Sequence, residues 1–152
     1  SYQQEITPGS MVISSSTVRC DGLTSQLVPT GFPAVADRHI VDALAAASVD
    51  SKFEGLQVHE GMTLTLDVFY NGVLEFPHHV YKKAGVLAAE MENSSLFVIA
   101  ALHGIKAGAI LAIDGFADAD LRDDYNPRTD TVAIAIEAEA IIALNALTKL
   151  TV

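Results

Sequence analysis

Three acidic side chains in the second half of the chain stand where apolar runs end. Glu90 and Glu92 come just after the apolar run 86–89, and Asp114 comes directly after the apolar run 107–113. Short apolar runs bounded by polar residues are typical of buried strands. Carboxylates at two strand ends can converge on one small molecule, where they act as hydrogen-bond acceptors, acids or bases.

A helix is predicted between the two apolar runs. Residues 93–102 carry apolar side chains at steps of three and four, and Gly104 follows, where a helix commonly ends in a left-handed residue. The whole segment is therefore predicted as strand, helix, strand, in a right-handed βαβ crossover. Because ligands bind at the carboxyl ends of strands in open parallel α/β sheets, the crossover would place the three carboxylates at one crevice.

These acidic residues also have a purely structural interpretation. A carboxylate such as Glu92 is favourable at a helix N-terminus, where it faces the positive end of the helix dipole. The pair Asp114-Gly115 is typical of a turn. Spacing alone leaves both interpretations open.

The rest of the chain predicts an α/β domain. Strands are expected at 11–16 and 62–68, helices at 37–47 and 129–150, and a loop at 25–33. With 152 residues and no linker, the chain is predicted to form a single domain over residues 1–152.

Composition narrows the classes of partner and compartment. The net charge of −10 argues against nucleic acid and anionic membranes as partners. No stretch reaches the apolar length of a membrane span, so no membrane contact is expected. Cys20 is the single cysteine, which excludes a disulfide framework and favours a cytoplasmic protein.

The remaining candidate residues give weaker signals. The five histidines lack the spacing of metal ligands, so no metal site is expected. No GxSxG elbow, P-loop or GxGxxG motif occurs, which leaves acyl transfer and dinucleotide binding without their usual supports. Phe69 and Tyr70 end a predicted strand, where they could stack on a flat ring or pack in the core.

Four segments, taken together and in order, carry a family resemblance. They are Thr17-Val18-Arg19-Cys20-Asp21-Gly22, Gly31-Phe32-Pro33-Ala34-Val35-Ala36-Asp37, Asp67-Val68-Phe69-Tyr70, and Glu90-Met91-Glu92 through Asp114-Gly115. The chain resembles the hexameric-type nucleoside phosphorylases, which include uridine phosphorylase and bacterial and protozoal purine nucleoside phosphorylases. The resemblance covers essentially the whole chain but only the later part of the family's chain. It implies a three-layer α/β/α fold with a central mixed sheet, from which the N-terminal part is missing.

The resemblance implies a role for each residue of the site. Glu92 would accept hydrogen bonds from the ribose hydroxyls, Met91 would pack under the ribose, and Glu90 would contribute nearby contacts. Phe69 would stack on the base. Asp114 matches the aspartate with which purine-specific members protonate or hydrogen-bond the purine ring.

The implied activity is phosphorolysis of a nucleoside to ribose 1-phosphate and free base, with phosphate as co-substrate and no cofactor. Uridine phosphorylases read uracil with a glutamine and an arginine, and the matching positions here are Val73 and Glu75. Neither residue can replace them, and together with Asp114 this favours a purine nucleoside. Uridine phosphorylase is the alternative.

The resemblance also implies partners. Family members form dimers that combine into hexamers, so a homo-oligomer is expected. The family's phosphate contacts precede the region that begins at Ser1, so a companion N-terminal polypeptide would have to supply them. The rival interpretation is a non-catalytic relative that binds or stores a nucleoside without a phosphate site.

Overall fold

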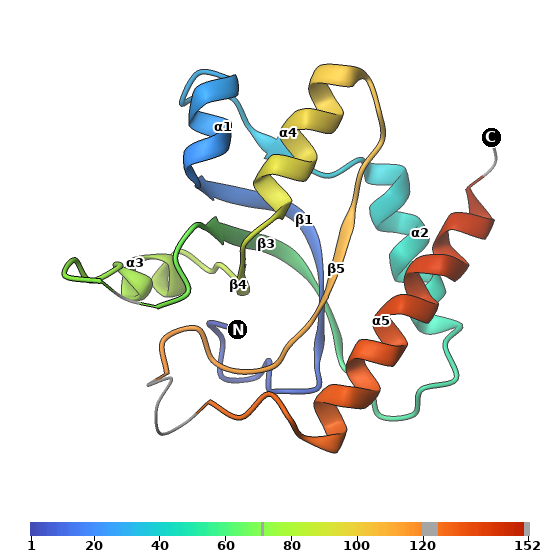
Figure 1. The fold of residues 1–152 in the computed structure, drawn as a ribbon. Coiled ribbons are helices and arrows are strands. Elements are labelled where there is room, and N and C mark those ends of the chain that lie inside the picture. The colour runs from blue at the N-terminus through green and yellow to red at the C-terminus, as the bar shows by residue number, and fades with distance from the viewer. Residues whose placement is uncertain (71, 120–124, 151–152) are drawn as a thin grey trace.

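The computed structural model describes residues 1–70, 72–119 and 125–150 (Figure 1). The strands are β1 (Met11–Cys20), β2 (Ala34–Val35), β3 (Val58–Leu66), β4 (Ala88–Glu90) and β5 (Ala109–Ala112). The helices are α1 (Gly22–Leu27), α2 (Arg38–Val49), α3 (His78–Lys83), α4 (Asn93–His103) and α5 (Asp130–Lys149).

The sheet is mixed, and its longest strand, β1, pairs along both edges. On one edge β1 runs parallel to β3, which in turn runs parallel to β4. On the other edge β1 pairs antiparallel with β2 near its carboxyl end and with β5 near its amino end. The predicted α/β class with a central mixed sheet and flanking helices is confirmed.

The direction of β5 contradicts the predicted crossover. After α4 the chain crosses to the far edge of β1, where β5 pairs antiparallel from Ser14↔Ala109 to Met11↔Ala112. β4 and β5 therefore run in opposite directions and do not form a parallel βαβ unit. Apolar periodicity predicts that a strand exists, but its direction depends on which distant strand it pairs with.

Local signals place the helix boundaries. Asp37 caps α2 by accepting hydrogen bonds from the backbone N–H groups of His39 and Ile40. Gly104 ends α4 in the left-handed conformation, with φ at 63°. Thr129 caps α5 through its hydroxyl oxygen. The sequence interpretation missed α1, which occupies the first part of the expected loop at 25–33.

Helix α5 departs from one expectation drawn from composition. It is long and apolar enough to cross a membrane, although no such stretch was expected. In the domain it packs on α2 and β5, with a stripe of residues turned into the core: Val132, Ala135, Ala138, Ile142 and Ala146. The opposite side of the helix exposes Ile134, Ile136, Leu144 and Leu147.

A buried polar network joins α1 to α4. The carboxylate of Asp21, which caps α1, accepts hydrogen bonds from the Thr24 backbone N–H and hydroxyl, both at 2.6 Å, and from the Ser94 hydroxyl. Arg19 donates to the Thr24 hydroxyl oxygen at 3.0 Å and to the Phe32 carbonyl. Burial alone would raise the pKa of Asp21, but the hydrogen bonds from Ser94 and Thr24 outweigh it and lower this pKa.

Because of this network, the free energy of unfolding should depend on pH in the acidic range. Because the folded pKa of Asp21 lies below its ordinary value of 3.8, the ionised carboxylate stabilises the fold above that value. The stabilisation is lost as the pH falls through the folded pKa. We expect the free energy of unfolding to fall more steeply between about pH 5 and about pH 3 in the natural chain than in Asp21→Asn. Urea denaturation across this range measures both slopes, and equal slopes would contradict the role of Asp21.

Candidate active site

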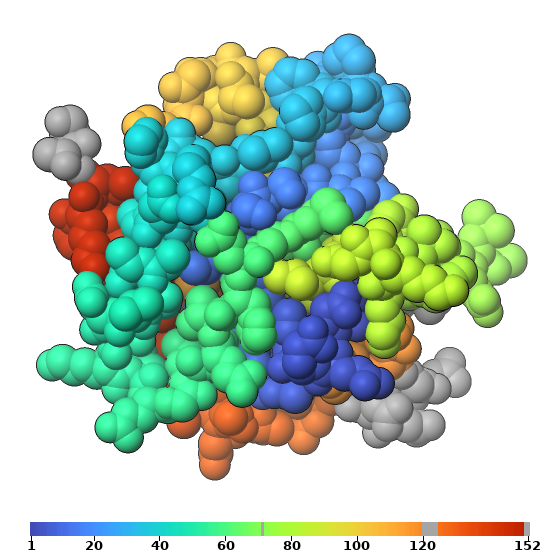
Figure 2. All heavy atoms as spheres, turned by 180° about the vertical axis from the view of Figure 1, so that it is seen from behind, coloured from blue at the N-terminus to red at the C-terminus, as the bar shows by residue number. Residues whose placement is uncertain are grey.

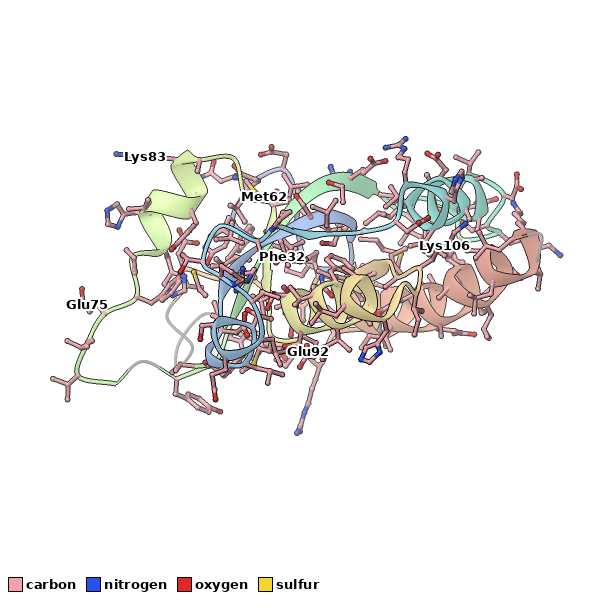
Figure 3. The ribbon with its side chains drawn as sticks, turned by 90° about the horizontal axis from the view of Figure 1, so that it is seen from above. Phe32, Met62, Glu75, Lys83, Glu92 and Lys106 are labelled. Atoms are coloured by element: carbon pink, nitrogen blue, oxygen red, sulfur yellow. The ribbon has the colours of Figure 1, made fainter. Side chains whose placement is uncertain are left out.

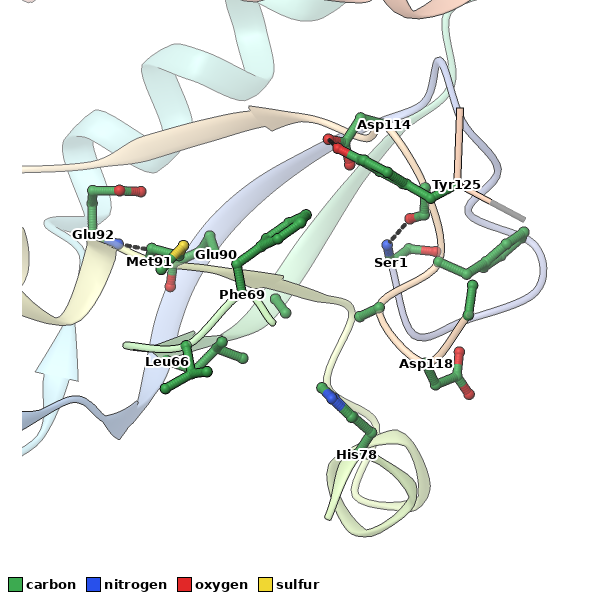
Figure 4. A pocket seen from close by; sticks show the side chains of 16 residues that line it. Ser1, Leu66, Phe69, His78, Glu90, Met91, Glu92, Asp114, Asp118 and Tyr125 are labelled. Atoms are coloured by element: carbon green, nitrogen blue, oxygen red, sulfur yellow. Dashed lines mark hydrogen bonds between the residues drawn. The ribbon is translucent and has the colours of Figure 1, made fainter. Parts of the chain in front are cut away.

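A pocket of about 310 Å³ opens beside the carboxyl ends of β3 and β4 (Figure 4). Phe69, from the loop after β3, and Met91 and Glu92, between β4 and α4, line it. The segment after β5 supplies Asp114. The three carboxylates expected to converge, Glu90, Glu92 and Asp114, all line this pocket, although Asp114 follows an antiparallel strand. A volume of this size suits a small ligand.

Glu90 lies at the inner wall of the pocket, where its carboxylate joins four protein donors. It accepts hydrogen bonds from the hydroxyls of Thr17 on β1, at 3.1 Å, and Thr65 on β3. It also accepts from the backbone N–H groups of Glu92 at 2.7 Å and Asn93 at 2.6 Å. These bonds attach the N-terminus of α4 to three strands, so Glu90 positions its neighbours.

Glu92 occupies the N-cap position of α4, but its side chain makes no capping hydrogen bond. The side chain is exposed and lines the pocket next to Met91. The carboxylate is therefore available to a ligand at the pocket. Its position at the N-terminus of α4 fits the structural interpretation, and its place in the pocket lining fits the ligand interpretation.

Asp114 is held by a residue that sequence reasoning missed. The Tyr125 hydroxyl donates to an Asp114 carboxylate oxygen at 2.5 Å, and its ring packs edge-on against Phe69 with centroids 5.9 Å apart. A Cβ atom on Gly115 would lie 2.8 Å from the Tyr125 ring, so this close approach requires glycine. Burial, together with the neighbouring Asp114, raises the pKa of Tyr125 to about 12. The phenol therefore stays a proton donor at neutral pH.

The aromatic pair at the end of β3 is not part of the core. Phe69 is 46% exposed and Tyr70 is 74% exposed, and their rings meet edge-on at 5.1 Å. Phe69 lines the pocket, whereas Tyr70 is not among its lining residues. Phe69 thus offers an aromatic surface to a ligand beside Asp114.

Acidic side chains line the pocket, but no lysine or arginine side chain does so among the residues that the structure describes. Arg19 is engaged with backbone carbonyls, while Arg122 lies outside the described residues. Within the same described ranges, no group of three acidic, histidine or cysteine side chains gathers as a metal site would require. His78 lines the pocket, and no sequence motif had singled it out.

Two solved structures that share this fold are nucleoside phosphorylases. The purine nucleoside phosphorylase of Toxoplasma gondii, in complex with immucillin-H, superposes with a TM-score of 0.85 and 28% identity, over 95% of this chain and 58% of that chain. A uridine phosphorylase of Vibrio fischeri shares the fold with a TM-score of 0.84 and 22% identity, over 98% of this chain and 60% of that one.

Sequence comparison gives the same family. The family model described as "Phosphorylase superfamily" matches residues 1–148, and the chain belongs to this superfamily. The guanosine phosphorylase of Halorubrum lacusprofundi is 31% identical, over 97% of this chain and 61% of its own length. The uridine phosphorylase of Escherichia coli is 29% identical, over 73% of this chain and 48% of its own length. The chain thus spans about half to three-fifths of the length of these curated relatives.

The two neighbouring glutamates should respond differently to loss of charge. Glu90→Gln leaves four donors with a weaker acceptor, so we expect a loss of about 1–3 kcal/mol in the free energy of unfolding. Glu92→Gln changes an exposed side chain for which the described residues provide no hydrogen-bond partner, and it should shift stability by no more than about 0.5 kcal/mol. Chemical denaturation of both variants tests this difference. A Glu92→Gln variant as destabilised as Glu90→Gln would show that both glutamates are structural.

Proposed function

We propose that this chain carries the nucleoside-binding part of a nucleoside phosphorylase with a purine nucleoside as substrate. The observation that supports this most directly is the pocket that gathers Phe69, Met91, Glu92 and Asp114. A carboxylate and a thioether side chain suit the hydroxyl edge and the apolar face of a ribose. An aromatic ring beside a carboxylate suits a base that must be stacked and protonated.

The reaction follows from this division of the pocket. Phosphate attacks the anomeric carbon as the glycosidic C–N bond breaks, and the products are ribose 1-phosphate and the free base. Positive charge develops on the sugar in an oxocarbenium-like transition state, while electron density moves onto the departing base. Glu92 holds the sugar through its hydroxyls, and Asp114 delivers a proton to a nitrogen of the base. Tyr125 holds Asp114 in place.

The loop between β3 and α3 supports a purine over uridine. Val73 and Glu75 occupy the positions at which uridine phosphorylases carry their uracil-reading glutamine and arginine. Both side chains are exposed, and neither lines the pocket. Figure 3 shows Glu75 on the outer loop, far from Glu92 at the start of α4. Uridine remains the alternative substrate.

Phosphate binding requires groups that the described pocket does not contain. A dianion needs charge-assisted donors, and no lysine or arginine lines the pocket in the described part of the chain. We infer that a companion polypeptide supplies these donors, within a cytoplasmic assembly of dimers that form a hexamer. A described pocket lining without lysine or arginine equally suits the second candidate function, a nucleoside-binding or storage protein without catalysis.

Nucleoside binding tests the proposed pocket directly. We expect the 152-residue chain to bind inosine in isothermal titration calorimetry. Glu92→Gln should weaken that binding roughly 10-fold to 150-fold, because a charge-assisted hydrogen bond contributes about 1.5–3 kcal/mol. Glu137→Gln, which removes the same charge from the exposed surface of α5, is the matched control. Inosine binding that is equal in both variants would exclude Glu92 as the ribose ligand.

Turnover separates the catalytic proposal from the binding alternative. The purified chain, free of any second polypeptide by mass spectrometry, should release no hypoxanthine from inosine and phosphate. No lysine or arginine lines its pocket among the described residues, and the net charge of −10 opposes the approach of an anion. Hypoxanthine release, followed by chromatography, should begin only when the remaining part of the phosphorylase is added. Turnover by the chain alone would contradict the companion polypeptide, and no turnover after the addition would favour the binding protein.

A further inference from the structure

The pocket contains a histidine to which the proposed function gives no role. His78 is the first residue of α3, and its ring is directed toward the pocket from the side opposite Asp114 (Figure 4). It belongs to the same connection as Val73 and Glu75, whose side chains do not line the pocket. Among the described residues between Phe69 and β4, His78 is the one that lines the pocket.

The ring of His78 is held by aromatic neighbours. The Tyr2 hydroxyl lies 2.8 Å from His78 Nδ1, and the ring centroids of Tyr2 and Phe76 lie 5.8 Å and 4.9 Å from that of His78. Tyr2 is itself fixed, because it is completely buried and its backbone N–H donates to the Leu87 carbonyl at 2.8 Å. Figure 2 shows the N-terminal residues, in dark blue, packed beside the yellow-green segment that contains α3.

This contact determines which nitrogen of His78 carries the proton. The Tyr2 hydroxyl has no other hydrogen-bond partner within the described part of the chain. A buried hydroxyl proton without an acceptor is costly, so Tyr2 donates and Nδ1 accepts. The proton of the neutral imidazole must then lie on Nε2. Burial lowers the pKa of His78 against the opposing effect of Asp118, and burial raises the pKa of Tyr2, so both groups are neutral near pH 7.

The side-chain hydroxyls that line the pocket are already committed as donors. The Ser1 hydroxyl donates to the Ile6 carbonyl at 2.6 Å, and the Tyr125 hydroxyl donates to Asp114. No partner is found for His78 Nε2 among the described residues. The Nε2–H group is therefore a neutral donor at the pocket, held in orientation by Tyr2.

We propose that His78 determines base specificity, with its Nε2–H donating a hydrogen bond to the 6-carbonyl oxygen of a 6-oxopurine nucleoside. The proposal rests on the proposed function, because it concerns the same pocket. The 6-oxygen and N7 lie on one edge of a purine, so His78 and Asp114 would read that edge from two sides. A 6-aminopurine presents N–H groups instead, which would face the His78 donor and leave it unpaired.

Paired binding measurements with inosine and adenosine test the proposal. His78→Phe keeps an aromatic ring against Phe76 but removes the donor, and it should weaken inosine binding about 10-fold. Adenosine binding should stay unchanged or tighten. His78→Gln places an amide donor near the position of Nε2 and should retain the preference for inosine. Tyr2→Phe keeps the packing but removes the hydrogen bond that fixes the tautomer of His78. Part of the preference for inosine over adenosine should therefore be lost.

The outcomes distinguish this inference from the proposed function. If the natural chain binds nucleosides but His78→Phe weakens inosine and adenosine equally, the ring only fills space and the inference fails alone. If the natural chain binds neither nucleoside, the proposed function fails and the inference falls with it. Tighter binding of adenosine than inosine by the natural chain would also overturn the assignment.

A measurement on the unaltered chain is independent of any folding defect in the variants. Nitrogen-15 NMR of the imidazole should show His78 neutral at pH 7 with its proton on Nε2. Inosine, but not adenosine, should shift the Nε2–H proton downfield. A proton found on Nδ1 in the inosine complex would overturn the proposal.

Discussion

The arrangement of the pocket depends on the carboxylate of Glu90. It accepts hydrogen bonds from side chains of two neighbouring strands and from two backbone N–H groups at the start of α4. These N–H groups are among those that a helix cannot satisfy internally, and Glu90 does so from the end of β4. The two residues that follow it, Met91 and Glu92, are thereby held at the mouth of the pocket. One glutamate positions the segment, and the other remains free for a ligand.

The fold could be predicted where local chemistry decides it. The left-handed Gly104 and the apolar spacing of residues 93–102 act within one or two helical turns, and both predictions are confirmed. The helix expected at 37–47 is found as α2, with Asp37 as its N-cap. The direction of β5 is set instead by pairing with β1, about a hundred residues away in the sequence. Helix α1 was missed because its capping residue, Asp21, also reads as part of a turn. Long-range pairing and turn-like caps leave no distinctive local pattern.

The residues of the site could likewise be predicted from the sequence, but the contacts between them could not. The carboxylates at strand ends and the family resemblance indicated Glu92, Asp114, Met91 and Phe69, and the structure brings these residues to one pocket. The role of Glu90 in positioning the start of α4 was not predictable, since its donors Thr17 and Thr65 come from other strands. Tyr125 and His78 were missed for a related reason. Their importance depends on contacts with Asp114 and Tyr2, and neither pair has a recognisable sequence spacing.

A crystal structure of the chain with inosine would test the central claim most directly. We expect ribose hydroxyl oxygens within hydrogen-bonding distance of the Glu92 carboxylate, with the base between Phe69 and Asp114. Glu90 should retain all four of its protein donors in that complex. Ribose hydroxyls bound to Glu90, with the start of α4 displaced, would contradict the proposed role of Glu92, and so would inosine bound outside this pocket.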